Sequence, residues 1–340
     1  MENGKQFNAK NVLTRSKKII FAECDLEYLE KYYVETKEIL DYTGIIFKNI
    51  NLSEKFDKLP VIEEEQIQNM TDVAIIIFKD LGDGNNRLDI RVKELRNCNN
   101  NVLIDHVLNY RRWMSLRILR ALGYYDYIDF NGNEISFSKF SGNGLIQISK
   151  FRMDLENNRV KLDYIDVMGK LDISLYGDGG FVEIGEHTTF VSGNIHVSTN
   201  GKVSIGNYCM FSHDFLIAQP DQHSIFDLKT HKRLNVGKNV NIGNHVWIGR
   251  YAKIGGGAGI PDNCIVGEAT VTTHCFTEPG CIIAGCPGRI IRRDVLWARD
   301  DQRSDLQIYD ECKDKKALEY LTDIQKEVFA GCGIYNDSKI

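Results

Sequence analysis

Ile242-Gly-Asn-His-Val-Trp247, Ile248-Gly-Arg-Tyr-Ala-Lys253, Ile254-Gly-Gly-Gly-Ala-Gly259, Ile260-Pro-Asp-Asn-Cys-Ile265 and Val266-Gly-Glu-Ala-Thr-Val271 follow one another without a break. Each of these hexads begins with Ile or Val, and its second residue is Gly or, once, Pro. The fifth residue is always compact. A period of six fits neither a helix of period 3.6 nor a flat strand of period 2. It is typical of a β-solenoid, in which each hexad forms one side of a coil.

The residue types suit that geometry. Inward Ile or Val side chains of successive coils would stack about 4.8 Å apart, the ordinary spacing between strands. Gly or Pro beside each aliphatic residue supplies the bend. The compact fifth residues, which would clash near a corner if they were larger, are Val246, Ala252, Ala258, Cys264 and Thr270.

Length and composition limit the number of domains, the kinds of partner and the compartment that are plausible. The 340 residues suffice for two or three domains. The net charge of −5 argues against a nucleic-acid partner. Nine cysteines without a CxxC pair indicate a reducing compartment. Residues 1–18 lack an apolar leader, and no apolar run approaches the roughly 20 residues of a membrane span. We therefore expect a cytoplasmic protein without a membrane span.

Three regions follow from the pattern along the chain. Residues 1–130 alternate expected strands (17–22, 44–47, 72–78) with expected helices (25–40, 102–122), which predicts a small α/β, Rossmann-like domain. The turn after its first strand, residues 23–27, has no glycine and offers no phosphate cradle. Residues 131–293 are predicted to form the β-solenoid. Residues 294–340 are predicted to form a helical tail, with helices at 296–302 and 315–328.

One segment must leave the solenoid. From Ile217 to Ile242 is 25 residues, which is not a multiple of six. We therefore predict an extruded loop at 219–240. It contains Asp221-Gln-His-Ser-Ile-Phe-Asp227 and the basic run Lys229-Thr-His-Lys-Arg233.

These motifs together resemble the left-handed β-helix hexapeptide acyltransferases. The resemblance covers residues 180–292, about a third of the chain. It is specific in the hexads, in the Asp221–Ile225 segment and in Ile283-Ala-Gly-Cys-Pro-Gly-Arg289. Within the family the chain is most similar to bacterial capsule and lipopolysaccharide sugar O-acetyltransferases. These carry the same Asp-x-His-Ser-Ile segment and then Ile-Gly-x-His-Val-Trp-Ile-Gly-Arg, matched here by residues 242–250.

The resemblance, and not the periodicity, implies the left hand of the helix. It also implies a homotrimer with sites in the grooves between neighbouring solenoids, acetyl-CoA as the cosubstrate and a carbohydrate acceptor. Direct acetyl transfer to a hydroxyl needs a base near pH 7, a donor for the oxyanion and an aligned channel. It needs no covalent enzyme intermediate, no nucleophilic cysteine and no metal.

His223 is the candidate base, because it lies in the matched motif and in the loop that breaks the six-residue phase. The alternative is a surface histidine on a flexible segment. Asp221 or Asp227 could orient its ring, or each could make a local turn bond. His213 and Asp214 could bind the acceptor, or they could be exposed solenoid corners.

Trp247 is a large ring at a position where a small residue would suffice. It is expected to line the groove for acetyl-CoA or sugar and to donate its N–H group, unless it is a trimer contact. His245 is expected to be an ordinary corner residue. By the resemblance, the pantetheine arm and the adenine with its 3′-phosphate would lie along Gly249, Gly267, Ala269, Pro287, Arg289, Arg292 and Arg293. For the basic residues among these, the alternative is a solvated terminal turn.

Three other functions compete with O-acetyl transfer. A zinc carbonic anhydrase of the same fold needs three His ligands, two of them five residues apart, and the histidines here lack that spacing. N-acetylation of a nucleotide-linked amino sugar is the main alternative, favoured by the extra N-terminal domain. A non-catalytic solenoid scaffold would have no reason to combine the His223 loop, Trp247 and a basic terminus. The acceptor sugar, and the hydroxyl that is acetylated, are not encoded in any recognisable motif.

Overall fold

A computed structural model of the chain describes residues 155–299 except 220 and 222, shorter stretches between residues 5 and 150, and residue 319. The chain divides into two compact units. One comprises residues 1–136, 145–159 and 174–178, and the other comprises residues 137–144, 160–173 and 179–340. The second unit contains the hexads, and it is mainly β.

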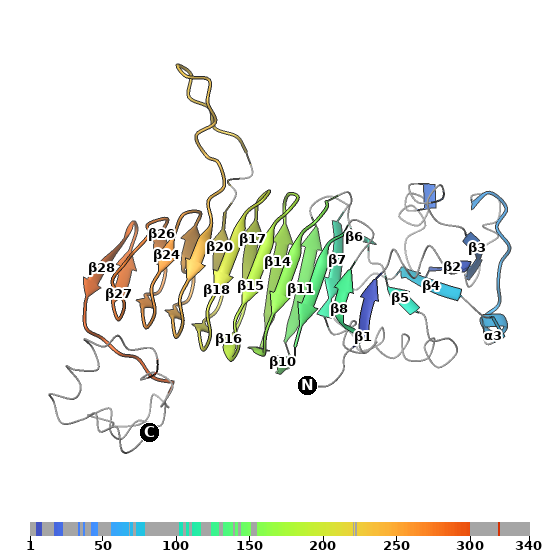
Figure 1. Ribbon diagram of the computed structural model, residues 1–340, viewed down its shortest axis with the longest axis horizontal. Coiled ribbons are helices and arrows are strands. Elements are labelled where there is room, and N and C mark those ends of the chain that lie inside the picture. The colour runs from blue at the N-terminus through green and yellow to red at the C-terminus, as the bar shows by residue number, and fades with distance from the viewer. Residues whose placement is uncertain are drawn as a thin grey trace. The chain divides into compact units, whose positions relative to one another are not determined.

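The second unit is a three-sided β-solenoid (Figure 1). The first face is built from β12 (Arg159–Leu162), β15 (Phe181–Ile184), β18 (Lys202–Ile205), β21 (Val240–Ile242) and β24 (Gly259–Ile260). The second face is built from β10 (Phe140–Ser141), β13 (Ile165–Val167), β16 (Thr188–Phe190), β19 (Met210–Phe211), β22 (Trp247–Ile248), β25 (Ile265–Val266), β27 (Ile282–Gly285) and β28 (Gly288–Arg292). The third face is built from β14 (Lys170–Leu175), β17 (Gly193–Val197), β20 (Phe215–Ala218), β23 (Lys253–Gly255) and β26 (Val271–Thr272).

The pairing confirms a parallel solenoid. From β15 onward, successive strands of each face pair in parallel, as in the register Val203↔Val240 on the first face and Phe211↔Ile248 on the second. The exception is the terminal hairpin, in which β27 and β28 are antiparallel. The six-residue period therefore corresponds to one strand and one corner, as expected from the sequence.

The interior confirms the roles of the first and fifth hexad positions. Each first residue is at most 3% exposed. The fifth residues Val246, Ala252, Ala258 and Cys264 are at most 1% exposed. Three packed rings fill two successive levels of the core, with Phe211 4.7 Å from Phe190 on the preceding coil and 4.8 Å from Phe215 on its own coil. Each buried aliphatic side chain contributes about 1.5–3 kcal/mol of stabilisation, so the stack of coils supports itself.

Equivalent corners of successive coils share one backbone conformation, with a residue at positive φ. The first corner, between the first and second faces, has a positive φ at His187, Tyr208, His245 and Asn263. The second corner, between the second and third faces, has a positive φ at Asp214, Tyr251 and Ala269. This left-handed conformation costs an L-residue about 1–2 kcal/mol, which hydrogen bonds between coils offset. At the first corner, for example, the His245 N–H donates to the Asn207 carbonyl at 2.8 Å.

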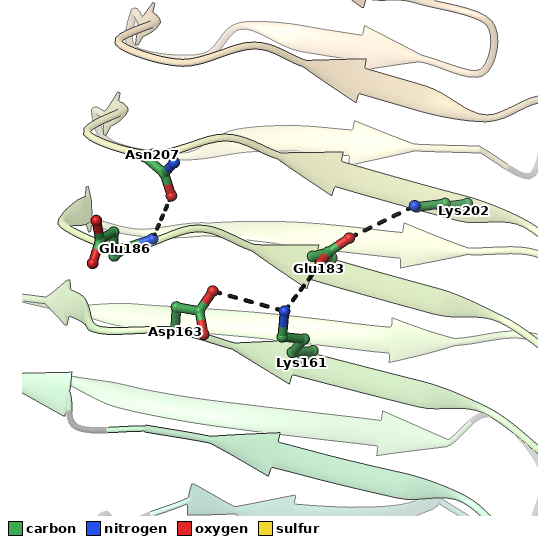
Figure 2. A network of polar contacts seen from close by, with 6 residues as sticks. All are labelled: Lys161, Asp163, Glu183, Glu186, Lys202 and Asn207. Carbon is green, nitrogen blue, oxygen red and sulfur yellow. Dashed lines mark hydrogen bonds and ion pairs between the residues drawn. The ribbon is translucent and has the colours of Figure 1, made fainter. Parts of the chain in front are cut away.

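Ion pairs connect the coils on the outside of the first face (Figure 2). Lys161 Nζ lies 3.2 Å from Glu183 and 3.9 Å from Asp163. Glu183 also pairs with Lys202 at 3.6 Å on the next coil. The hydrogen bond to Glu183, followed by the charge of Asp163, raises the pKa of Lys161. Exposed pairs of this kind contribute about 0–1 kcal/mol each, so this face is a solvated, charge-balanced surface.

The other unit contains a parallel sheet in the order β3-β2-β4-β5. Its elements are β2 (Lys17–Ala22), β3 (Tyr42–Ile46), β4 (Val73–Phe78) and β5 (Val102–Ile104), with the short helix α3 (Glu64–Ile67) nearby in sequence. The first three strands confirm the sequence expectation. The remaining strands of this unit are β1 (Lys5–Asn8), β6 (Val107–Leu108), β7 (Arg111–Ser115), β8 (Tyr124–Ile128), β9 (Glu134–Phe137) and β11 (Leu145–Lys150).

Two helix predictions are wrong where the structure describes them. Residues 102–104, 107–108 and 111–115 are strands, not the start of a helix over 102–122. Trp113 pairs with Ser149 of β11 in an antiparallel ladder, and such long-range pairing outweighs a helical sequence pattern. Residues 296–299 are not helical either, because they bind along the solenoid. Most of the predicted helix 25–40, and all but residue 319 of the tail 300–340, lie outside the described residues.

The Rossmann-like assignment, the domain boundaries and the helical tail therefore stay predictions. Within the described part of the chain, no helix has the length and apolarity that crossing a membrane requires.

Candidate functional site

The predicted loop is present and forms a narrow projection from the solenoid, which we call the arm (residues 219–239). It connects β20 to β21, at the third corner, between the third and first faces (Figure 1). The phase break between Ile217 and Ile242 located it correctly.

The root of the arm is clamped by one buried side chain. Gln219 is 5% exposed, and its Nε2 donates to the carbonyls of Lys202 at 2.7 Å and Lys238 at 3.0 Å. Its Oε1 accepts the Ser198 N–H at 3.3 Å. Lys238 lies in the returning leg, where the arm rejoins the solenoid. Gln219 therefore ties both legs of the arm to the coil beneath.

A second amide joins the two legs higher up. Asn235 Nδ2 donates to the His223 carbonyl at 2.6 Å and to Asp221 Oδ2 at 3.1 Å. Its Oδ1 accepts the Ile225 N–H at 2.8 Å. The Leu234 N–H donates back to the Ile225 carbonyl at 2.8 Å. These bonds fix the backbone on both sides of the His223 side chain.

The two candidate orienting carboxylates are used within the arm. Asp227 Oδ1 accepts hydrogen bonds from the backbone N–H groups of Lys229 and Thr230 and from the Thr230 hydroxyl, at 2.6–3.0 Å. The Thr230 bonds, followed by the Lys229 bond, lower the pKa of Asp227. Asp227 thus makes the local turn bonds that were its alternative interpretation, and Asp221 binds Asn235. No described residue hydrogen-bonds the exposed imidazole of His223.

Trp247 lies on the second face and points outward, because the next residue, Ile248, is buried in the core. In register it stands between Met210 on one coil and Ile265 on the other. Ile282 follows on the coil beyond. All four side chains are half-buried. The outside of the second face is therefore an apolar stripe centred on Trp247, unlike the charged first face.

The candidate acceptor and pantetheine residues gather at the second corner, beside this stripe. His213 and Asp214 are exposed there, and Asp214 Oδ1 accepts the Ser192 hydroxyl at 3.1 Å. On later coils, Gly249, Gly267 and Ala269 follow at the same corner.

Close stacking of the coils is sufficient to explain why residue 249 is a glycine. A Cβ on Gly249 would lie 2.7 Å from the Glu268 nitrogen and 2.8 Å from the Val266 carbonyl. Gly249 is also buried, whereas Ala269 is exposed. The cofactor-binding roles at this corner stay predictions.

The basic residues of the terminus sit on the β27–β28 hairpin. Pro287 lies in its turn, and Arg289 and Arg292 are exposed on β28. Arg293 is engaged differently: its Nε and Nη2 contact Glu278 at 2.6 and 3.2 Å. No described residue hydrogen-bonds the guanidinium groups of Arg289 and Arg292, so this pair fits a phosphate better than Arg293 does.

Sequence reasoning missed one part of this region, the segment 295–299. The Trp297 ring stacks on His245 at 4.1 Å with an interplanar angle of 14°, and it lies 6.0 Å from the Trp247 ring. His245 is indeed a corner residue, but it is fully buried and also supports this contact. The sequence pattern predicts a helix at 296–302, and Trp297 within it was the available signal for a contact with the solenoid.

Cys209 and Cys264 are buried in the core of the solenoid. Burial raises the pKa of Cys209 and of Cys264 to about 12, so neither thiol ionises near neutrality. Within the described residues, no cluster of three or more His, Cys, Asp or Glu side chains could hold a metal ion.

The order of the strands shows how the two main candidate residues, His223 on the arm and Trp247 on the second face, are placed within one chain. The arm leaves from the third corner, which in a three-sided prism is the edge opposite the second face. Trp247 projects from that second face. The arm and the Trp247 indole of one chain therefore lie on opposite sides of the solenoid.

Comparisons with known proteins were made by sequence and by structure. No protein-family model matches the chain. It is 35% identical over 124 residues to a polysialic acid O-acetyltransferase of Escherichia coli O1:K1 / APEC, covering 36% of this chain and 40% of that protein. It is 38% identical over 103 residues to the polysialic acid O-acetyltransferase of Neisseria meningitidis, covering 29% of this chain and 46% of that protein.

The matched part is thus less than half the length of either curated relative. Among solved structures, the polysialic acid O-acetyltransferase OatWY matches with a TM-score of 0.48 and 32% identity, covering 57% of this chain and 89% of that chain. Over the matched stretch, the chain is therefore similar to two polysialic acid O-acetyltransferases.

Proposed function

We propose that the protein transfers an acetyl group from acetyl-CoA to a hydroxyl of a surface-polysaccharide sugar, and that it does so as a homotrimer with a left-handed helix. The observation that carries the proposal is the separation of the His223 arm from the Trp247 face. A catalytic unit containing both side chains requires two copies of the chain. The arm of one copy would lie on the second face of its neighbour.

The surfaces of the arm and of the second face support this arrangement. Ile225, Phe226, Leu228, Leu234 and Val236 on the arm are each more than half exposed, and Leu228 is 91% exposed. An apolar projection of this kind is unusual for a protein that works alone. The apolar stripe around Trp247 has matching chemistry. Packing one on the other buries both and brings His223 of one copy toward Trp247 of the next.

His223 would act as the general base. Neutral imidazole accepts the proton of the acceptor hydroxyl while its oxygen attacks the thioester carbonyl carbon. As the tetrahedral intermediate collapses, the C–S bond breaks and the imidazolium returns the proton to the departing thiolate. The Trp247 indole N–H would donate to a reacting oxygen. The high pKa of the buried Cys209 and Cys264 thiols makes these two side chains poor nucleophiles for an acyl-enzyme.

The donor would lie beside the second corner. The exposed guanidinium groups of Arg289 and Arg292 would hold the 3′-phosphate, with Pro287 against the adenine. Arg293 would contribute less, because Glu278 already neutralises it. Gly267 and Ala269 would border the pantetheine arm, and His213 and Asp214 would contact the acceptor. The free cysteines at 209, 264, 275, 281 and 286 are in keeping with work in the cytoplasm.

The arm also suits an acidic acceptor. Lys229, Lys232 and Arg233 at its tip are exposed. The two curated relatives are named for polysialic acid, a polymer of an acidic sugar. Basic side chains near the base would attract such a polymer and hold its hydroxyl groups within reach.

Incubation with radiolabelled acetyl-CoA and a panel of acceptors tests this function. The panel should contain acidic polysaccharides, neutral polysaccharides and nucleotide-linked amino sugars. We expect label on an acidic polymer that mild alkali releases, because esters are cleaved where amides survive, and no label with the His223→Ala variant. Alkali-stable label on an amino sugar would instead establish the N-acetyltransferase alternative. Absence of label on every acceptor would refute the proposal.

A further inference from the structure

The chain beyond β28 turns back along the first corner and crosses several coils. We call residues 295–299 the strap. The Val295 N–H donates to the Gly280 carbonyl at 2.9 Å, and Trp297 Nε1 donates to the His245 carbonyl at 2.8 Å. Arg299 then donates to the carbonyls of Tyr208 at 3.0 Å and Cys209 at 2.6 Å, and to Thr189 Oγ1 at 2.9 Å. The strap is therefore bonded to successive levels of the solenoid.

Trp297 is the buried centre of the strap. Its side chain is 5% exposed, it stacks on His245, and the Arg299 guanidinium lies 5.7 Å from its ring centroid. His245 is itself fixed, because its Nδ1 lies 2.8 Å from Asn263 Oδ1 on the next coil. The position of the Trp297 indole is thus determined by a hydrogen bond, a stacked ring and a nearby cation.

The strap borders the outward side of the second face at Trp247. The two indole centroids are 6.0 Å apart with an interplanar angle of 47°, a favourable tilted geometry. Trp247 is half-buried and points out of the solenoid, so the core does not enclose its ring. A fixed neighbour on one side removes some of the rotamers open to that ring.

We infer that Trp297 is a positioning residue for Trp247, holding the Trp247 indole in the orientation that acetyl transfer requires. The inference rests on the proposed function, in which Trp247 meets the reacting groups. Donors oriented before the reaction stabilise a transition state more than mobile donors do, because the ordering cost is met during folding. The strap then contributes to catalysis by orienting Trp247, in addition to holding successive coils together.

A double-mutant cycle separates these two roles. Purified trimers of the wild type, Trp297→Ala, Trp247→Ala and the double variant are assayed for kcat and for the KM of acetyl-CoA. We expect Trp297→Ala to lower kcat about tenfold with a KM change below about twofold, and to lower it less than about twofold when Trp247 is already Ala. Phe190→Leu, a core change at another coil, controls for general destabilisation and should leave kcat nearly unchanged.

The same loss of kcat with and without Trp247 would overturn the inference, because a purely structural role of Trp297 does not depend on Trp247. If Trp297→Ala does not fold, Trp297→Phe keeps a ring on His245 and should lose part of the rate. Near-UV circular dichroism provides a readout without turnover. In a Trp113→Phe background, the Trp247 signal is the difference between spectra with Trp247 and with Trp247→Phe, and Trp297→Phe should change that difference. An unchanged signal would refute the contact even if no acetyl transfer were found, whereas a changed signal with an inactive wild type would overturn only the proposed function.

Discussion

Asn235 Nδ2 donates a hydrogen bond to the backbone carbonyl of His223 at 2.6 Å, across the two legs of the arm. The same amide also binds the Asp221 carboxylate and the Ile225 N–H. The candidate base is thus held through its main chain, while its imidazole stays available to a substrate.

Replacement of Asn235 by Ala should therefore separate the two legs around His223. We expect kcat to fall about tenfold, with little change in acetyl-CoA binding measured by calorimetry, because the base loses its position and the donor site is elsewhere. Asn241→Ala, an exposed Asn on β21, is the matched control and should be neutral. Equal losses in the two variants would show that the amide network of the arm does not matter.

Removal of the imidazole itself should have the larger effect. His223→Ala is expected to lower turnover by about 10²–10⁴-fold, the usual contribution of a general base, with the oligomer and acetyl-CoA binding intact. His231→Ala removes an exposed histidine from the tip of the same arm and should retain most of the activity. A His223 variant as active as the His231 variant would remove His223 from the mechanism.

The three packed Phe rings should make a large contribution to the stability of the solenoid. Phe211→Ala leaves a cavity between Phe190 and Phe215, and we expect a loss of about 3–5 kcal/mol in the free energy of unfolding. Urea denaturation followed by circular dichroism measures this loss. Met168→Ala, at a side chain that is 60% exposed, should change it by less than about 0.5 kcal/mol. A small loss at Phe211 would mean that the coils do not share one packed core.

The histidine on β17 predicts a dependence of stability on pH. Partial burial lowers the pKa of His196 below 6.5, and the charge of Asp172 opposes this only in part. The unfolded state then binds a proton more readily, so stability is complete above pH 6.5 and declines as the pH falls through the lowered pKa. His196→Gln should lose this component of the decline. Unfolding curves of wild type and variant that change in parallel on both sides of pH 6.5 would contradict the assignment.

The solenoid could be predicted because its code is local. Each hexad specifies an inward aliphatic residue, a bend and a compact corner residue, and stacking repeats that choice on every coil. The arm could be located for the same reason, since any insertion breaks the phase of six. The outward direction of Trp247 follows from the burial of Ile248 in the first position of the next hexad.

The remaining features depend on contacts between distant segments. The helical pattern of residues 102–122 does not reveal that Trp113 pairs with Ser149, and nothing near Trp297 in the sequence points to His245. Asp227 could equally have faced His223 or its own turn, and only the folded arm shows the turn bonds to Thr230. Local periodicity therefore predicted the solenoid, whereas the details of the candidate site came from tertiary contacts.

The central claim is that one catalytic unit takes His223 from one chain and Trp247 from another, and co-expression of two inactive variants tests it most directly. His223→Ala and Trp247→Ala chains with different affinity tags are purified as mixed oligomers and assayed for acetyl transfer. A trimer that contains both variants has one site of three that combines an intact arm with an intact second face, so about a third of wild-type turnover should return. Mixed oligomers that remain as inactive as either parent would contradict the account.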